Sequence, residues 1–284
     1  MGELIKAQEI KLLALDIDGT LFNSAGEITP ASIAELRKLQ ERKISIVLAS
    51  GRDYNGMPWE QLKEISIDYV ITTNGSAVYQ TGNRRCLQEI CLEREMLIPI
   101  FQYLLKKEVY LSVFIDGVNY TPTQCLVYLE QLELPDYVKE SLRENCHEIE
   151  GLVDYIQRYP VNIQKVTLNF SKDRDGTYHN REEVKQYLEG CPYIHVVDGG
   201  FANLEFTKAG VSKKTGLLFL TEYLDLSMNQ VLAIGDSEND LEMLEAAGTG
   251  VAMGNAASEV KRAADDITAG NDEEGVALAI RKYF

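Results

Sequence analysis

Apolar runs alternate with helix-like segments over the first third of the chain. Residues 10–16 are almost entirely apolar and too few for a helix, which is typical of a buried parallel strand. A helix is expected next, because Thr29 suits the cap position and Pro30 the first helical position. Two further apolar runs, at 44–52 and 68–79, predict strands separated by a polar, helix-compatible stretch. This alternation indicates a doubly wound, mainly parallel α/β sheet.

The pattern changes near residue 85, where short alternating strands mix with helical segments. Two Asp-Gly pairs indicate hairpin turns in this region; they are Asp116-Gly117 and Asp198-Gly199. The strand–helix alternation resumes near residue 201. We therefore expect a Rossmann-like core made of residues 1–84 and 201–284, interrupted by an inserted α+β cap domain over 85–200.

Charge and composition narrow the classes of partner. With 28 Lys and Arg against 44 Asp and Glu, the formal net charge is -16. Such a surface repels nucleic acids and anionic membranes, so we expect neither as a partner, whereas a small anionic substrate can bind where positive charge is local. The five cysteines show no Cys-x-x-Cys spacing, and the N-terminus has no signal-peptide pattern. These features predict a cytoplasmic protein with reduced thiols.

Polar residues gather where the predicted core strands end or the following helices begin. Ligands of open α/β sheets bind beyond the carboxyl ends of the strands. The four groups are Asp16 with Asp18, Ser50 with Gly51 and Arg52, Lys213, and Asp236 with Asn239 and Asp240. If strand geometry persists through Asp18, the carboxylates of Asp16 and Asp18 face one cleft.

This set of side chains matches the needs of phosphoryl transfer. A carboxylate can attack a phosphate only if charge is screened, and Mg²⁺ prefers such oxygen ligands. A lysine and the N–H groups of a Ser-Gly turn can hold the phosphoryl oxygens, while a second carboxyl group can move protons. Each motif alone is weak evidence, but their combination and order are specific.

The chain resembles the haloacid dehalogenase superfamily, and within it the Cof-like phosphatases with a large cap. The motifs that carry the resemblance are DIDGTLF (16–22), ASGR (49–52), GVSKKTGL (210–217) and GDSENDLEML (235–244). Two positions depart from the family pattern. Ser50 stands where threonine is common, which keeps the hydroxyl group, and Lys214 stands where glycine is common.

The resemblance implies a role for each motif residue. Asp16 would be the nucleophile and Asp18 the general acid and base. Mg²⁺ would be held by Asp16, the main-chain carbonyl of Asp18, and Asp236. The remaining residues would bind phosphate or support these groups: Ser50, Gly51 and Lys213 for the phosphoryl group, and Asn239 and Asp240 in support.

The leading hypothesis is a Mg²⁺-dependent phosphatase that hydrolyses a small phosphorylated metabolite, such as a sugar phosphate, through an aspartyl phosphate. One alternative is a phosphomutase on the same fold, which returns the phosphoryl group to its substrate. Another is a catalytically inactive, metabolite-binding regulator. The intact quartet of carboxylates and lysine argues against the regulator, and the motifs say nothing about oligomeric state.

Overall fold

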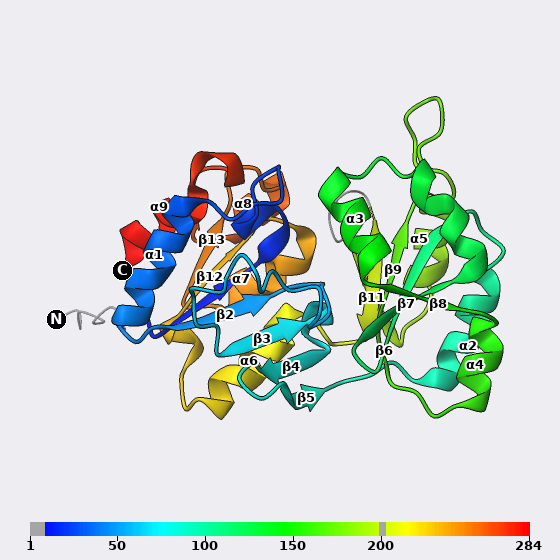
Figure 1. Ribbon diagram of the computed structural model, residues 1–284, viewed down its shortest axis with the longest axis horizontal. Coiled ribbons are helices and arrows are strands. Elements are labelled where there is room, and N and C mark those ends of the chain that lie inside the picture. Colours follow the sequence, from blue (N-terminus) through cyan, green and yellow to red (C-terminus); the bar gives the residue numbers. More distant parts are fainter. Residues whose placement is uncertain (1–8, 199–202) are drawn as a thin grey trace.

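Two β-sheets with separate hydrophobic cores make up the structure (Figure 1). It is a computed structural model that describes residues 9–198 and 203–284. The larger sheet has eight strands, and in the following order the last two pairs of neighbouring strands are antiparallel and the other pairs are parallel. In order they are β14 (Asp266–Ile267), β13 (Thr249–Ala252), β12 (Val231–Gly235), β1 (Leu12–Leu15), β2 (Ser45–Ala49), β3 (Tyr69–Thr72), β4 (Ala77–Gln80) and β5 (Arg85–Glu89). The predicted mainly parallel α/β fold is confirmed.

The helices of this unit cover both faces of the sheet. They are α1 (Pro30–Glu41), α6 (Lys213–Tyr223), α7 (Leu241–Ala246), α8 (Ser258–Ala263) and α9 (Gly275–Tyr283). Helix α1 connects β1 to β2, whereas α7 connects β12 to β13 on the opposite side of β1. Right-handed crossovers that run in opposite directions place their helices on opposite faces. The strand order therefore reverses between β1 and β12, which is where ligands of such sheets bind.

The local sequence correctly predicts the start of α1 but wrongly predicts a helix in the segment between β2 and β3. The N–H of Ser32 donates to Oγ1 of Thr29, as the predicted cap requires. The helix expected between β2 and β3 is wrong, because residues 51–68 form turns. Side chains hold these turns: the N–H of Gly56 donates to Oδ1 of Asp53, and Nε1 of Trp59 donates to the carbonyl of Tyr54.

The smaller sheet has six strands, antiparallel except for one parallel pair, β7 and β8. In order they are β10 (Ile194–Val197), β11 (Leu204–Lys208), β9 (Ile163–Asn169), β6 (Tyr110–Ile115), β7 (Val118–Pro122) and β8 (Cys146–Ile149). Its helices are α2 (Arg94–Leu104), α3 (Asp136–Glu144), α4 (Leu152–Arg158) and α5 (Arg181–Glu189). Figure 1 shows α3 on the side of this unit that is nearest to the larger sheet.

One of the two predicted hairpin turns can be checked. Asp116 and Gly117 both have positive φ and join β6 to β7, as a tight turn of this kind requires. The second, Asp198-Gly199, falls partly on residues 199–202, outside the described residues, as does the predicted boundary between residues 200 and 201.

The sheets divide the chain at positions that differ from the predicted ranges. Strand β5 begins at the expected start of the insert, yet it pairs with β4 in the larger sheet. Strand β11 follows the expected end of the insert, yet it pairs with β9 in the smaller sheet. We propose that the insert spans about residues 90–208. The two connecting segments lie side by side, because Nζ of Lys208 is 3.2 Å from Oε1 of Glu93.

Among residues 9–198 and 203–284, no helix is both long enough and apolar enough to cross a bilayer. The five cysteines are free. Residues 1–8, on which the prediction about the N-terminus rests, lie outside the described residues.

Candidate active site

The end of β1 brings two carboxylates to one pocket. β1 ends at Leu15, and Ile17–Leu21 form a tight turn, although the backbone of Asp18 itself stays extended, with a φ of −79° and a ψ of 116°. Asp16 and Asp18 nevertheless line the same pocket, as predicted. The turn depends on Gly19, which has a φ of +82°. A Cβ atom there would lie 2.4 Å from Oδ2 of Asp236, so a larger residue would displace that carboxylate.

Lys213 joins two of the carboxylates. Its ammonium nitrogen lies 2.5 Å from Oδ1 of Asp16 and 2.7 Å from Oδ1 of Asp240. Lys213 is the first residue of α6, and the N–H of Ser212, which precedes this helix, donates to Oγ1 of Thr215. Only 1% of Lys213 is exposed. Burial lowers the pKa of Lys213, but Asp16 and Asp240 outweigh this effect and raise it, so the side chain is an ammonium.

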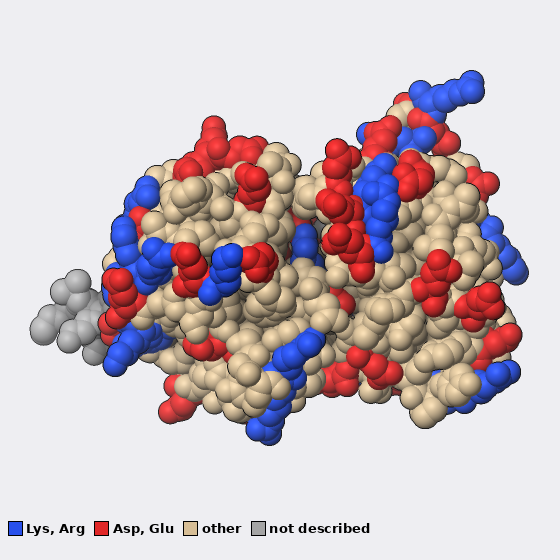
Figure 2. Space-filling view, in the orientation of Figure 1, with Lys and Arg blue, Asp and Glu red and all other residues tan. Residues whose placement is uncertain are grey.

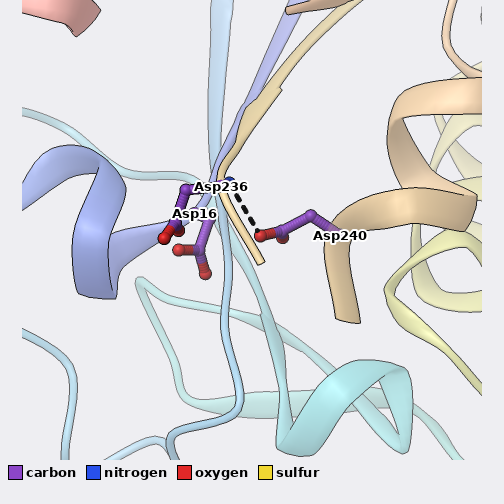
Figure 3. Close-up of side chains that lie close together, drawn as sticks. All are labelled: Asp16, Asp236 and Asp240. Carbon is purple, nitrogen blue, oxygen red and sulfur yellow. Dashed lines mark hydrogen bonds between the residues drawn. The ribbon is translucent and has the colours of Figure 1, made fainter. Parts of the chain in front are cut away.

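Asp16, Asp236 and Asp240 form a cluster in which one carboxylate oxygen from each residue lies within 4.8 Å of the others (Figure 3). Asp240 is occupied by hydrogen bonds: its Oδ2 accepts from the N–H groups of Asp236 and Ser237, and its Oδ1 accepts from the lysine. Among the residues that the structure describes, Asp236 accepts only from two hydroxyl groups, those of Thr20 and Ser237. Asp16 and Asp236 therefore have more free acceptor capacity than Asp240.

The electrostatics of this cluster favour a cation. Burial and the charge of Asp240 raise the pKa of Asp16 well above its usual value. The same two causes raise the pKa of Asp236 to about 7. Two buried carboxylates and one partly buried carboxylate face one buried ammonium here, and such an excess of negative charge is costly unless a further cation compensates it. The donors are all oxygen atoms, so Asp16 and Asp236 fit a hard divalent metal ion, with Asp240 orienting the groups around them.

The remaining predicted residues lie around the same pocket. Ser50 follows β2 and is 1% exposed, and its Oγ accepts from the N–H of Arg52 at 3.2 Å. Gly51 lines the pocket beside it. Nδ2 of Asn239 donates to Oδ1 of Asn74, while Oδ1 of Asn239 is buried with no hydrogen-bond partner among the described residues. The structure thus brings all eight predicted residues together.

Sequence reasoning grouped Arg52 with Ser50 and Gly51 at the end of a strand but gave its side chain no role in the site. Its Nε and Nη2 each lie 2.8 Å from one carboxylate oxygen of Asp18. Burial raises the pKa of Asp18, but the charge and hydrogen bonds of Arg52 outweigh burial and lower it. Asp18 is therefore held as a carboxylate in a fixed orientation.

The smaller sheet supplies the opposite wall of the pocket. Lys165 on β9 and Glu205 on β11 form a buried ion pair, with 2.6 Å between Nζ and Oε1. Glu205 also accepts from Nδ2 of Asn74, which follows β3, so this contact crosses between the two units. The pocket has about 850 Å³ of empty space, part of it open to solvent. Figure 2 shows basic side chains at the bottom of the groove between the units and acidic side chains along α3.

Lys165 and Glu205 carried a weak sequence signal. Both are charged residues that stand next to apolar ones in short strand-like segments, a pattern that calls for a partner if the strand is buried. Their pairing spans strands far apart in the sequence, so no local motif identifies it.

Comparisons with known proteins agree with this geometry. The sequence profile of the haloacid dehalogenase-like hydrolases matches residues 13–280. Phosphatase YwpJ of Bacillus subtilis is 29% identical to the chain over 282 residues, which cover 94% of this chain and 98% of the relative. The 5-amino-6-(5-phospho-D-ribitylamino)uracil phosphatase YcsE of the same organism is 28% identical, with 97% and 96% covered. A solved haloacid dehalogenase-like hydrolase from B. subtilis superposes with a TM-score of 0.83 at 26% identity, and the match covers 97% of this chain and 100% of that one.

Proposed function

Since the chain belongs to the haloacid dehalogenase-like hydrolases, we propose that it is a Mg²⁺-dependent phosphatase that hydrolyses a small phosphorylated metabolite. The names of two relatives that match almost the whole chain support the reaction class. One of them acts on a phosphorylated sugar alcohol joined to a uracil, which supports a substrate of the sugar phosphate kind. The observation that carries the proposal is the convergence of Asp16, Lys213 and Asp236 at the switch point of the sheet.

Asp16 is the nucleophile in this proposal. One of its oxygen atoms attacks the phosphorus atom, and the bond from phosphorus to the leaving oxygen breaks. Lys213 uses two of its three N–H donors on Asp16 and Asp240, which leaves one for a phosphoryl oxygen. Ser50 and the N–H of Gly51 hold other phosphoryl oxygens from the end of β2.

Asp18 moves the protons. In the first step it delivers a proton to the leaving oxygen, and the nearby phosphate dianion favours that protonated state because two neighbouring anions repel each other. In the second step water attacks the aspartyl phosphate, the bond between phosphorus and Asp16 breaks, and the carboxylate of Asp18 takes the water proton. Arg52 keeps Asp18 in the carboxylate form that this second step requires.

Asp16 and Asp236 are the side chains that would hold Mg²⁺, together with the main-chain carbonyl of Asp18. The bound ion would supply positive charge that lets one anion attack another. Asp240 does not bind the ion in this proposal. It positions Lys213 and the main-chain N–H groups of Asp236 and Ser237.

A panel of phosphate monoesters, assayed with Mg²⁺ for released inorganic phosphate, tests the proposal. We expect release from at least one sugar phosphate and from p-nitrophenyl phosphate, and no release by the Asp16→Asn variant. Transfer of the phosphoryl group between substrate positions without free phosphate would identify a phosphomutase instead. Binding of phosphorylated metabolites without turnover would identify a regulator.

A further inference from the structure

A chain of four side chains links the insert to Asp18. The Arg52 guanidinium binds both carboxylate oxygens of Asp18, through its Nε and Nη2 atoms. The guanidinium is itself fixed, because its Nη1 donates to the carbonyl of Gly56 at 2.8 Å and its carbon atom lies 5.2 Å from the centre of the Phe22 ring. The next ring is Tyr137, which meets Phe22 edge-on with 6.2 Å between ring centres.

Tyr137 belongs to α3 of the insert, whereas the other three residues belong to the larger unit. It also fits closely against the turn that follows Phe22: a Cβ atom on Gly26 would lie 2.7 Å from Cγ of Tyr137. A larger residue at position 26 could not keep this contact, and the φ of +76° at Gly26 likewise favours glycine. The contact between Tyr137 and Phe22 is therefore one of the places where the insert packs against the larger unit.

Helix α3 depends on such contacts for its place. None of its nine described residues is fully buried, although Val138, Ser141 and Leu142 line the pocket. A helix without a buried face gains little from the core of its own unit. Burial also raises the pKa of the Tyr137 phenol to about 12, so at neutral pH the ring meets Phe22 as an uncharged group.

We propose that Tyr137 is a positioning residue, which holds the carboxylate of Asp18 in place through Phe22 and Arg52. The proposal rests on the phosphatase function and adds a dependence on the insert. When α3 packs against the larger unit, the carboxylate of Asp18 is oriented for water activation. When α3 is displaced from the larger unit, this orientation is held less well. The step concerned is hydrolysis of the aspartyl phosphate. Water oxygen bonds to phosphorus, the bond to Asp16 breaks, the water proton goes to Asp18, and inorganic phosphate leaves.

The two half-reactions separate this role from a merely structural one. p-Nitrophenolate leaves without needing a proton, so formation of the phosphoprotein from p-nitrophenyl phosphate does not depend on the position of Asp18. Its breakdown does depend on it. Loss of the Tyr137 ring should therefore slow breakdown and leave formation almost unchanged.

The experiment is a rapid-quench measurement on the full-length chain with Mg²⁺. Formation is followed by the p-nitrophenol burst, and breakdown by the mass of acid-quenched protein after substrate is exhausted. For Tyr137→Ala we expect breakdown to slow about 2- to 10-fold, the factor that corresponds to one aromatic pair. Tyr137→Phe should restore it, because the contact with Phe22 needs the ring and not the hydroxyl group.

Tyr159→Ala is the matched control. Tyr159 is also a tyrosine of the insert that contacts another aromatic ring, but it is 46% exposed and its partner is Tyr155 of the insert. Equal breakdown rates for the two alanine variants, or a parallel loss of formation and breakdown in Tyr137→Ala, would overturn the inference alone. Wild-type protein that releases no phosphate from any ester would instead overturn the proposed function. Circular dichroism of each variant confirms that it is folded.

Discussion

Lys165 and Glu205 are paired in the wall of the pocket, with 2.6 Å between their charged groups and almost no exposure of either side chain. Burial lowers the pKa of Lys165, and the charge of Glu205 opposes that shift. Removing one partner therefore leaves an uncompensated charge in a place that water scarcely reaches. The pair belongs to one sheet, but Asn74 connects it to the other unit.

We predict that Glu205→Gln lowers the free energy of unfolding by about 3–5 kcal/mol, as expected when a buried pair loses one member. The double variant Lys165→Met/Glu205→Leu should recover most of this loss, because no buried charge remains. Urea denaturation followed by circular dichroism measures both. A double variant as unstable as Glu205→Gln would show that the pair contributes through packing or hydrogen bonds rather than charge.

Two carboxylate variants should fail at different steps. Asp16→Asn has no nucleophile, so it should form no covalent adduct. Asp18→Asn keeps the nucleophile, so with p-nitrophenyl phosphate it should accumulate a phosphoprotein that is stable in acid and labile in base. Mass spectrometry of quenched protein detects the adduct, and peptide mapping should place it on Asp16. An adduct on any other residue would refute the assignment of the nucleophile.

Removal of divalent metal ions should abolish phosphate release. The acidic cluster contains only oxygen donors, with no Cys or His, so Mg²⁺ should restore activity better than Zn²⁺ after treatment with EDTA. Released phosphate is measured after each metal is added back to the stripped protein. Asp236→Asn should need a much higher Mg²⁺ concentration than the wild type. Full activity of exhaustively stripped protein would contradict a metal requirement.

An ion pair far from the pocket predicts a pH-dependent stability. Glu35 on α1 accepts from Nζ of Lys38 and from Nε of Arg281 on α9, and these bonds hold its pKa below its ordinary value of 4.5. A lowered pKa means that the carboxylate stabilises the fold above pH 4.5, and that this contribution is lost as the pH falls through the lowered value. Both cations are about half exposed or more, so the contribution at pH 7 is modest, roughly 1 kcal/mol.

Glu35→Gln tests this expectation. It should lower the free energy of unfolding at pH 7, and the difference from wild type should shrink toward zero below pH 4.5. Glu60→Gln is the control, because the exposed Lys63 is the one ion-pair partner of Glu60 within residues 9–198 and 203–284. A difference at Glu35 that stays constant across this range would mean that the carboxylate charge does not stabilise the fold.

The proposed insert boundaries predict that the larger unit can stand alone. The two connecting segments meet at Glu93 and Lys208, so a short Gly/Ser linker can replace residues 90–208 without stretching the chain. We expect the shortened protein to hydrolyse p-nitrophenyl phosphate weakly with Mg²⁺ and to lose most discrimination among metabolites. The ranking of substrates by kcat/KM is the measurement. A folded shortened protein with the wild-type ranking would show that the insert does not determine specificity.

The parts of the site that follow strand ends were predictable because the sheet itself places them. Asp16 and Asp236 follow two neighbouring parallel strands, and each stands in a local motif that contains a glycine. The parallel α/β pattern therefore brings them together without further information. The same logic covers Ser50, which follows the strand on the other side of β1.

The missed parts depend on contacts that have no local pattern. Arg52 was visible in a motif, but only the turns of residues 51–68, where a helix was expected, aim its guanidinium at Asp18. Tyr137 lies on a short amphipathic helix, and the sequence alone does not indicate where on the insert that helix packs. Its contact with Phe22 depends on how the two units pack against each other. The two residues are more than one hundred positions apart in the sequence.

The two adjacent connections between the sheets have a kinetic consequence. The floor of the pocket belongs to one unit and a wall to the other, yet both remain on one chain at a fixed high effective concentration. Separation and return of the two units would therefore be a unimolecular event, whose rate does not change when the protein is diluted. The two connections lie side by side at Glu93 and Lys208, so both would bend at the same place.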